Sequence, residues 1–244
     1  MLDRSGSPRQ VGHAASAGGT LDKTDHAGSY ARAALLITGF GPFPGAPTNP
    51  TAEVVERLVE QAWAPRGARV RALVAPVRWS GSAETIDEAV RESGCDGALL
   101  LGVAGKAREF RVEMRARNHA DRRRPDSDGK HWRNEKIDPT GPAVARSTAP
   151  VAEMVRAIQD AGFPSVASSD AGDYLCNFTL YRLLTGVGEG AYAPPIGFLH
   201  VPRVIERDGV EVPVSLDDLE RAVKAATTAF AFSLMPRTAA LVLA

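Results

Sequence analysis

Cys176 is the residue of this sequence best placed for covalent chemistry. It follows a polar turn; before the turn the apolar run 164–167 predicts a buried strand, and after it Phe178, Tyr181 and Leu184 recur at helical spacing. The unpaired backbone N–H groups at a helix N-terminus favour a thiolate, and they can also hold the oxyanion formed when sulfur attacks a carbonyl. A lone cysteine is more often a small core residue, so this segment alone leaves both interpretations open.

A thiolate nucleophile needs a base, and His200 is the histidine whose position suits that role. The other four lie in segments that are predicted to be disordered or exposed: His13, His26, His119 and His131. His200 lies near the end of a buried-type strand, between Leu199 and Val201. A satisfied core histidine is the commoner case, but catalytic groups of open α/β sheets gather at the carboxyl ends of strands, which both His200 and Cys176 reach.

An acidic residue that orients the imidazole would complete this set, and Glu113 is the candidate. It lies on a segment in which apolar and polar residues alternate, and the other polar positions of that segment are arginines. Glu113 could equally be an exposed residue that pairs with Arg111 or Arg115, an interaction of little energetic value. Periodicity alone does not choose between these interpretations.

The composition is that of a globular protein of 244 residues, long enough for one α/β domain with a buried core. The formal net charge is +0, so no overall field attracts nucleic acid or an anionic membrane, and no apolar run is long enough to span a bilayer. Two cysteines cannot build a disulfide framework or a cysteine zinc site, and we expect Cys95 to pack in the core. We therefore expect no metal and no cofactor, and a reducing compartment, with the cytoplasm as the default location.

The composition divides the chain into three segments. Residues 1–32 are rich in Gly, Ala and Ser, show no hydrophobic periodicity and lack the apolar stretch of a secretory signal, so they are predicted to be a disordered extension. Residues 33–236 are expected to form the folded catalytic domain. Residues 237–244 form a short apolar tail that the pattern does not place.

Strand-like runs and helical stripes alternate along residues 33–236. Strands are expected at 33–38, 70–77, 97–102, 164–167 and 195–202, and a half-exposed strand over 110–118 whose apolar face is Phe110, Val112, Met114 and Ala116. Helices are expected after Asn49-Pro50, after Ser80 or Ser82, over 150–161, after Cys176 and from Ser215. This alternation predicts an α/β fold, with a mostly parallel twisted sheet and helices on both faces.

Two further segments carry local signals. Residues 121–139 are highly charged without periodicity, which predicts a long surface loop that is functional or mobile. Asp208-Gly209 between β-type residues predicts a hairpin, and Ser215 followed by Asp218 is close to a capping box.

Four blocks then stand out in order along the chain. They are Thr38-Gly-Phe-Gly-Pro-Phe43 with Asn49-Pro50, Glu113-Met-Arg-Ala-Arg-Asn118, Ser169-Asp-Ala-Gly-Asp-Tyr-Leu-Cys-Asn177 with Tyr181, and Gly197-Phe-Leu-His-Val-Pro202. Together they resemble the pyroglutamyl peptidase I (pyrrolidone-carboxylate peptidase) family of cysteine peptidases. The resemblance covers nearly everything from Leu35 to Pro202 and implies a single-domain α/β/α sandwich.

The resemblance also implies roles for particular residues. Cys176 would be the nucleophile, His200 the general acid and base, and Glu113 the acid that orients the imidazole. The substrate-binding positions that it implies are Phe40, Phe43, Val103, Arg123, Tyr174 and Leu175. In that set the two phenylalanines enclose a pyrrolidone ring, and backbone groups at Val103 read the lactam amide. Family members assemble as dimers or tetramers, so a homo-oligomer is implied as well.

This chain departs from the family pattern at three positions near those residues. Arg124 replaces an apolar residue, Ser127 replaces an asparagine, and Met114 follows Glu113 where a basic residue is common. These departures leave the three catalytic candidates in place and bear on substrate preference and rate.

We therefore expect hydrolysis of an N-terminal pyroglutamyl residue from peptides or amides through a thioester, with no nucleic-acid or membrane partner. The alternative is a catalytically weak or inactive member that binds pyroglutamyl-like ligands, with Arg124 preventing turnover. A nucleotide-binding domain ranks last. The glycine-containing loop 39–45 carries aromatic residues and prolines where a phosphate cradle needs open backbone, and no Walker lysine follows.

Overall fold

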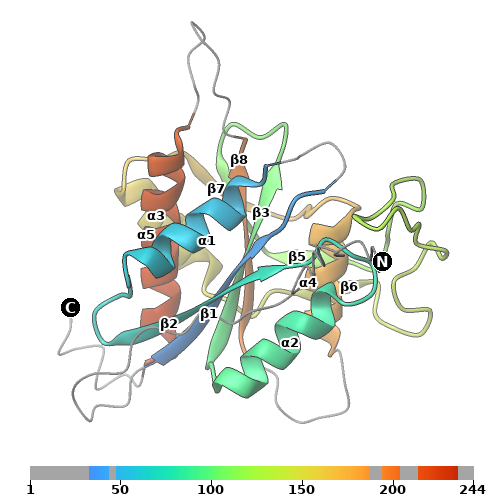
Figure 1. Ribbon diagram of the computed structural model, residues 1–244, viewed down its shortest axis with the longest axis horizontal. Helices are drawn as coiled ribbons and strands as arrows, with labels where there is room; N and C mark the ends of the chain where they lie inside the picture. The colour runs from blue at the N-terminus through green and yellow to red at the C-terminus, as the bar shows by residue number, and fades with distance from the viewer. Residues whose placement is uncertain (1–32, 44–47, 187–193, 204–213, 236–244) are drawn as a thin grey trace, which may run out of the picture.

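A six-stranded sheet runs through the centre of the protein, with helices on both of its faces (Figure 1). The computed structural model describes residues 33–43, 48–186, 194–203 and 214–235. The strands are β1 (Ala33–Phe40), β2 (Ala68–Ala75), β3 (Gly97–Ala104), β4 (Phe110–Glu113), β5 (Arg115–Arg117), β6 (Val144–Arg146), β7 (Ser165–Ser168) and β8 (Ile196–Pro202). The helices are α1 (Pro50–Glu60), α2 (Ser82–Ser93), α3 (Val151–Asp160), α4 (Leu175–Thr185) and α5 (Leu216–Leu234).

The order of the strands in the main sheet is β2-β1-β3-β8-β4-β7. Strands β2, β1, β3 and β8 are parallel to one another, whereas β4 runs antiparallel to β8 and parallel to β7. A second sheet contains only β5 and β6, which pair antiparallel. The expected α/β fold with a mostly parallel sheet is therefore confirmed.

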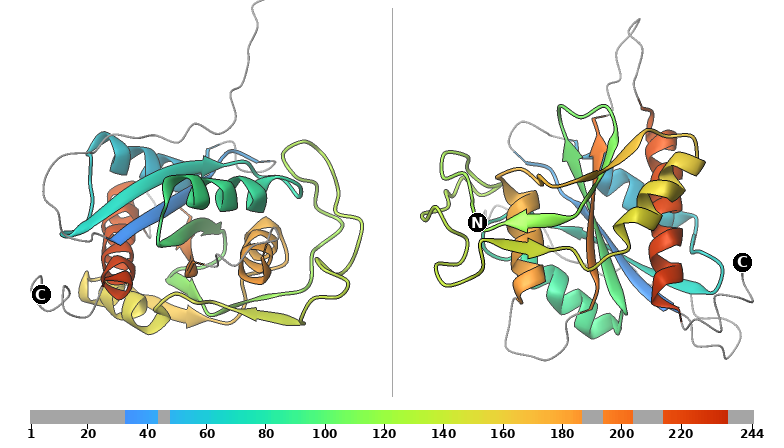
Figure 2. Two further views of the ribbon diagram at one scale, coloured as in Figure 1. Left: turned by 90° about the horizontal axis from the view of Figure 1, so that it is seen from below. Right: turned by 180° about the vertical axis from the view of Figure 1, so that it is seen from behind.

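Two hydrophobic clusters, one on each face of the sheet, hold these layers together. Helices α1, α3 and α5 cover one face and share a core with Leu35, Leu99 and Leu199. Helices α2 and α4 cover the other face and pack on Leu36, Leu100 and Phe198. In the right-hand view of Figure 2, α3 and α5 lie on one side of the sheet, and α2 and α4 on the other. The alternation of strand side chains explains why both faces are apolar.

Several helix ends follow the chemistry that the sequence indicated. Asn49 is the N-cap of α1, and its side chain accepts hydrogen bonds from the backbone and hydroxyl of Thr51 at 3.2 and 2.8 Å. Ser215 and Asp218 form the expected capping box at the start of α5. Helix α4 ends at Gly186, whose positive φ suits glycine.

The predicted strand over 110–118 is wrong as a single element. It is divided at Met114 into β4, inside the main sheet, and β5, which leaves that sheet to pair with β6. The change of partner also changes which side chains are buried. Met114 is 42% exposed, whereas Glu113, on the face expected to be polar and open, is fully buried.

The run expected to form a buried strand at 164–167 also needs correction. Strand β7 spans Ser165–Ser168 and lies at the edge of the main sheet, so Val166 is 41% exposed. A short apolar run does not distinguish an edge strand from an interior one, because both bury at least one face.

The predicted extension 1–32, the hairpin at Asp208-Gly209 and the tail 237–244 lie outside the described residues. Within the described ranges, no helix has both the length and the apolar character that crossing a bilayer requires.

Gly39 is the position at which β1 and α1 come too close for any larger residue. A Cβ at Gly39 would lie 2.4 Å from the carbonyl oxygen of Thr51, which is backbone and cannot move aside cheaply. We expect Gly39→Ala to lower the free energy of unfolding by about 1–3 kcal/mol through overpacking, as measured by urea denaturation. The matched control is Gly41→Ala, whose Cβ would meet the carbonyl oxygen of Ala75 at 3.8 Å and no nearer non-adjacent atom of the residues that the structure describes. Equal unfolding midpoints for the two variants would contradict this account.

Candidate active site

An open cleft of about 810 Å³ lies where β1, β3 and β8 end. Its position agrees with the rule that ligands of open α/β sheets bind at the carboxyl ends of strands. Its lining includes most of the residues singled out from the sequence: Phe40, Phe43, Val103, Tyr174, Leu175, Cys176 and His200. The fold therefore gathers at one edge of the sheet residues that are up to 160 positions apart in the chain.

Cys176 lies in the first turn of α4, one residue after the helix begins at Leu175. The N-cap residue is Tyr174, whose side chain makes no capping hydrogen bond to the helix. The first backbone N–H groups of a helix have no partner within the helix, so those around Cys176 can serve an incoming anion. The thiol is partly exposed and lines the cleft. This agrees with the prediction that Cys176 lies at a helix N-terminus.

His200 and Glu113 form a buried hydrogen-bonded pair. Nδ1 of His200 lies 2.8 Å from Oε1 of Glu113. The pair forms because β4 runs antiparallel to β8, which brings Arg111 opposite His200 and places Glu113 two residues further along β4. Glu113 is fully buried and His200 is 6% exposed, so water does not compete for this contact.

The imidazole also meets the thiol, which completes a line of three groups. The imidazole of His200 interacts with the thiol of Cys176 as well as with the carboxyl group of Glu113. Burial of the ring lowers the pKa of His200, but the charges and hydrogen bonds of Cys176 and Glu113 outweigh burial and raise it to about 9. The imidazolium form of His200 is therefore favoured.

Gly102 is a site residue that the sequence analysis missed. It is paired with His200 across β3 and β8, and a Cβ at this position would lie 2.9 Å from Sγ of Cys176. The same Cβ would lie 2.7 Å from the ring of Phe198. Glycine is thus the residue that lets the thiol approach the strand next to the histidine. The predicted strand 97–102 ended at Gly102, whereas β3 continues to Ala104, so the glycine lies inside the strand, where a glycine often marks a close approach.

Asn177 fixes the start of α4 relative to β5. Its side-chain oxygen accepts from the backbone N–H of Arg117 at 2.8 Å, and its Nδ2 donates to the carbonyls of Arg117 and His119, each at 2.9 Å. Asn177 is fully buried, so these bonds satisfy both ends of its amide. The residue next to the thiol therefore attaches the helix to a separate sheet.

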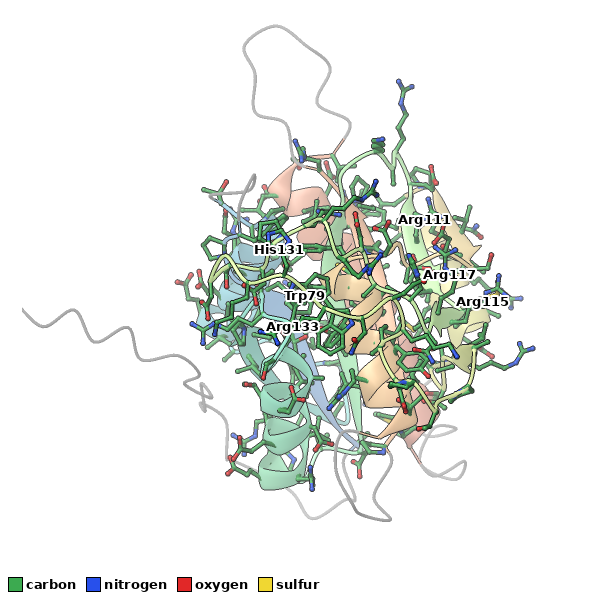
Figure 3. All side chains as sticks on the ribbon, turned by 90° about the vertical axis from the view of Figure 1, so that its right-hand side faces the viewer. Trp79, Arg111, Arg115, Arg117, His131 and Arg133 are labelled. Atoms are coloured by element: carbon green, nitrogen blue, oxygen red, sulfur yellow. The ribbon has the colours of Figure 1, made fainter. Side chains whose placement is uncertain are left out.

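Three arginines on β4 and β5 hold the turn that leads into α4. Arg111, Arg115 and Arg117 all donate to groups within 168–172, and the shortest of these bonds joins Arg117 to the carboxylate of Asp170 at 2.7 Å. In Figure 3 the three arginines lie near one another on one side of the molecule. The turn before the thiol is thus fixed from the same strands that carry Glu113.

Aromatic side chains form the part of the cleft that lies over β1. The ring of Phe40 stacks on Phe198 at a centroid distance of 6.4 Å, and Phe43 meets Tyr174 at 6.2 Å. Phe40 is held in place from α1, because its N–H donates to the hydroxyl of Thr51 at 3.1 Å. The cleft thus has an apolar end suited to a flat, uncharged ring.

Arg124, which departs from the family pattern, lies at the cleft, whereas Arg123 does not line it. The guanidinium of Arg124 lies 3.9 Å from the centroid of the Tyr174 ring and 4.0 Å from Asp173. The side chain of Arg123 is 87% exposed and binds Asp121, lowering the pKa of that carboxyl to about 2. Contact of Arg123 with substrate stays a prediction.

The charged loop 121–139 is anchored rather than loose. Asp126 is buried and accepts hydrogen bonds from the backbone of Trp79, Asp128 and Lys130. The hydroxyl of Tyr174 donates to the carbonyl of Pro125 at 2.6 Å, which ties the loop to the entrance of α4. Charge and lack of periodicity identified a surface loop, but they gave no sign of these anchors.

Among the described residues, no group of three or more His, Cys, Asp or Glu side chains is arranged to hold a metal ion.

Comparison with known proteins places this geometry in a family. The sequence model for pyroglutamyl peptidase matches residues 33–232. The chain is 33% identical over 196 residues to pyrrolidone-carboxylate peptidase 1 of Caldanaerobacter subterraneus, covering 79% of this chain and 95% of that protein. It is also 33% identical to pyrrolidone-carboxylate peptidase of Streptococcus pyogenes, covering 79% of this chain and 89% of the relative.

Solved structures agree with these sequence relatives. Pyroglutamyl peptidase I from Bacillus amyloliquefaciens superposes with a TM-score of 0.75 at 30% identity, covering 82% of this chain and 95% of that one. A mutant pyrrolidone carboxyl peptidase from Pyrococcus furiosus superposes with a TM-score of 0.73 at 30% identity, covering 83% of this chain and 100% of that one. From the extent of these matches, the chain belongs to the pyroglutamyl peptidase family.

Proposed function

We propose that this chain hydrolyses the amide bond that follows an N-terminal pyroglutamyl residue, with Cys176 as nucleophile, His200 as general acid and base, and Glu113 as the orienting acid. The observation that carries the proposal is the line of three groups from the buried carboxylate through the imidazole to the thiol at the cleft. The names of the relatives, pyrrolidone-carboxylate peptidases, support the substrate class.

In the first half of the reaction, the thiolate of Cys176 attacks the carbonyl carbon of the pyroglutamyl residue. Negative charge moves to the carbonyl oxygen, where the N–H groups at the start of α4 stabilise it. When the C–N bond breaks, the imidazolium of His200 gives its proton to the departing amine. The peptide leaves with a free amino group, and the pyroglutamyl group remains on sulfur as a thioester.

In the second half, the neutral imidazole takes a proton from water, and the water oxygen attacks the thioester carbon. The C–S bond breaks, free pyroglutamate leaves, and thiolate and imidazolium are restored together. Glu113 keeps Nδ1 of His200 occupied throughout, so the other ring nitrogen faces the reacting atoms. Because the carboxylate is buried, it also stabilises the positive ring without exchanging its partner for water.

Specificity for the lactam follows from the aromatic end of the cleft. A pyroglutamyl ring is flat and uncharged, so it can enter between Phe40 and Phe43 and use the backbone near Val103 for its amide. An N-terminal glutamine or glutamate carries an ammonium group, and an apolar end does not repay the cost of removing water from that charge. Arg124, which departs from the family pattern, leaves the aromatic end of the cleft open to the pyroglutamyl ring, because Tyr174 and Asp173 hold the guanidinium of Arg124.

Replacement of the thiol tests the nucleophile. We expect Cys176→Ala and Cys176→Ser to abolish turnover of a pyroglutamyl-aminocoumarin substrate, while a prolyl-aminocoumarin stays uncleaved by every form. Iodoacetamide should inactivate the unmodified chain, because Cys176 is partly exposed and Cys95 is buried. If either variant retains turnover, Cys176 is not the nucleophile. Thermal stabilisation by pyroglutamate without hydrolysis of any pyroglutamyl amide would instead favour a binding module.

Replacement of the acid tests the role of the Glu113 carboxylate through pH. Reaction requires the imidazolium, so the rate should fall as pH rises through the pKa of His200, which is about 9. Glu113 contributes to raising that pKa, so Glu113→Gln should move the alkaline limb of kcat to lower pH and reduce kcat. A pH–rate profile of both proteins measures this shift. An unchanged alkaline limb in the variant would show that Glu113 does not act through His200.

Enlargement of Gly102 tests the approach of the thiol to the histidine. Gly102→Ala would push Sγ or the ring of Phe198 away, and a displacement of about 1 Å at reacting groups can reduce kcat about 100-fold. We expect a large fall in kcat with little change in KM, measured together with the thermal unfolding temperature to confirm that the fold is kept. Wild-type kcat in a folded Gly102→Ala protein would refute this role.

A further inference from the structure

The residues that line the cleft change from aromatic to cationic along the order of the strands in the sheet. Phe40 ends β1, Gly102 lies on the next strand β3, His200 on β8 and Arg111 on β4, so the histidine lies between an aromatic end and an arginine. Neighbouring strands are about 4.8 Å apart, so this row spans about 14 Å. A substrate whose ring occupies the aromatic end and whose scissile carbonyl faces the thiol must therefore extend its leaving group toward β4.

Arg111 is the charged side chain that such a leaving group would meet. It lies directly opposite His200 in the antiparallel pair, so the two side chains share one face of the sheet, and both line the cleft. Its Nη2 donates to the hydroxyl of Ser168 at 3.0 Å, which fixes the guanidinium. Its Nε is buried without a hydrogen-bond partner, and no carboxylate of the described residues lies within ion-pair distance of Arg111.

The charges around Arg111 increase its positive field. Lys106 and Arg108, on the connection from β3 to β4, line the same cleft and form no ion pair with the residues that the structure describes. Glu109 is the acid of this connection that lines the cleft, so cations are in excess around Arg111. Two further acids that line the cleft are already paired, Asp170 with Arg117 at 2.7 Å and Asp173 with Arg124 at 4.0 Å.

We propose that Arg111, assisted by Lys106 and Arg108, makes this enzyme select pyroglutamyl peptides in which the next residue has a carboxylate side chain. This inference rests on the proposed function and adds to it the chemistry of the leaving group. The guanidinium is already held by Ser168, so binding a carboxylate costs little side-chain ordering. The three cations also attract an anionic substrate from a distance, and added salt shortens the range of this attraction.

The test compares two peptides that differ only in charge, pyroglutamyl-glutamate amide and pyroglutamyl-glutamine amide. The full chain should show a kcat/KM about fivefold higher for the glutamate peptide at low ionic strength, and salt should reduce the ratio. Arg111→Gln keeps a donor for Ser168 but lacks the charge, and it should bring the ratio close to one. Arg111→Lys should keep a ratio above one. The matched control is Arg146→Met, an exposed arginine of β6 outside the cleft, which should leave the ratio unchanged.

The ratio of the two kcat/KM values distinguishes a role of Arg111 in substrate selection from a role in supporting the fold. A ratio near one in the unmodified chain would overturn the proposal. So would equal losses on both peptides in Arg111→Gln, because Arg111 would then serve only to hold Ser168. If the glutamine peptide is hydrolysed in either case, the peptidase activity itself stands. If neither peptide is hydrolysed, the proposed function fails first.

Discussion

The buried contact between His200 and Glu113 governs how the residues of the cleft are arranged. A carboxylate without access to water is costly unless it is paired, and loss of one partner from such a pair typically costs about 3–5 kcal/mol. The partner comes from across the β4–β8 junction, which among the described strands is the antiparallel pair of the main sheet. The reversal of β4 thus brings the carboxyl group of Glu113 to the ring of His200.

The thiol of Cys176 is positioned beside that pair by a different set of contacts. Helix α4 is positioned by Asn177 against β5 and by three arginines that bind the turn before it. These contacts come from the continuation of the strand that carries Glu113, so one segment of the chain sets the acid and the thiol together. Gly102 then removes the side chain that would otherwise separate sulfur from imidazole. The geometry is therefore determined by packing and hydrogen bonds that surround the reactive groups rather than by those groups alone.

The cleft combines two environments. Aromatic rings lie over the end of β1, whereas Arg111 of β4 and Lys106 and Arg108 of the preceding connection bring cations that form no ion pair with the described residues. The charged loop 121–139 contributes Arg124 to the lining of the cleft and is anchored by the buried side chain of Asp126, which binds the backbone of Trp79. Arg124 of this loop departs from the family pattern, and its guanidinium stacks on the ring of Tyr174.

Much of this protein followed from local sequence. Apolar runs placed the strands of the parallel part, Asn49 and Ser215 marked helix starts, and the four blocks with their three candidate residues identified the family. These signals are readable because caps, turns and nearest-neighbour periodicity act over a few residues. The tertiary structure alone decided that Glu113 is buried while Met114 is exposed, that β7 is an edge strand, and that Arg124 rather than Arg123 lines the cleft. Those outcomes depend on which strand pairs with which, a choice made by contacts between residues tens of positions apart, and alternation along a single segment carries no information about it.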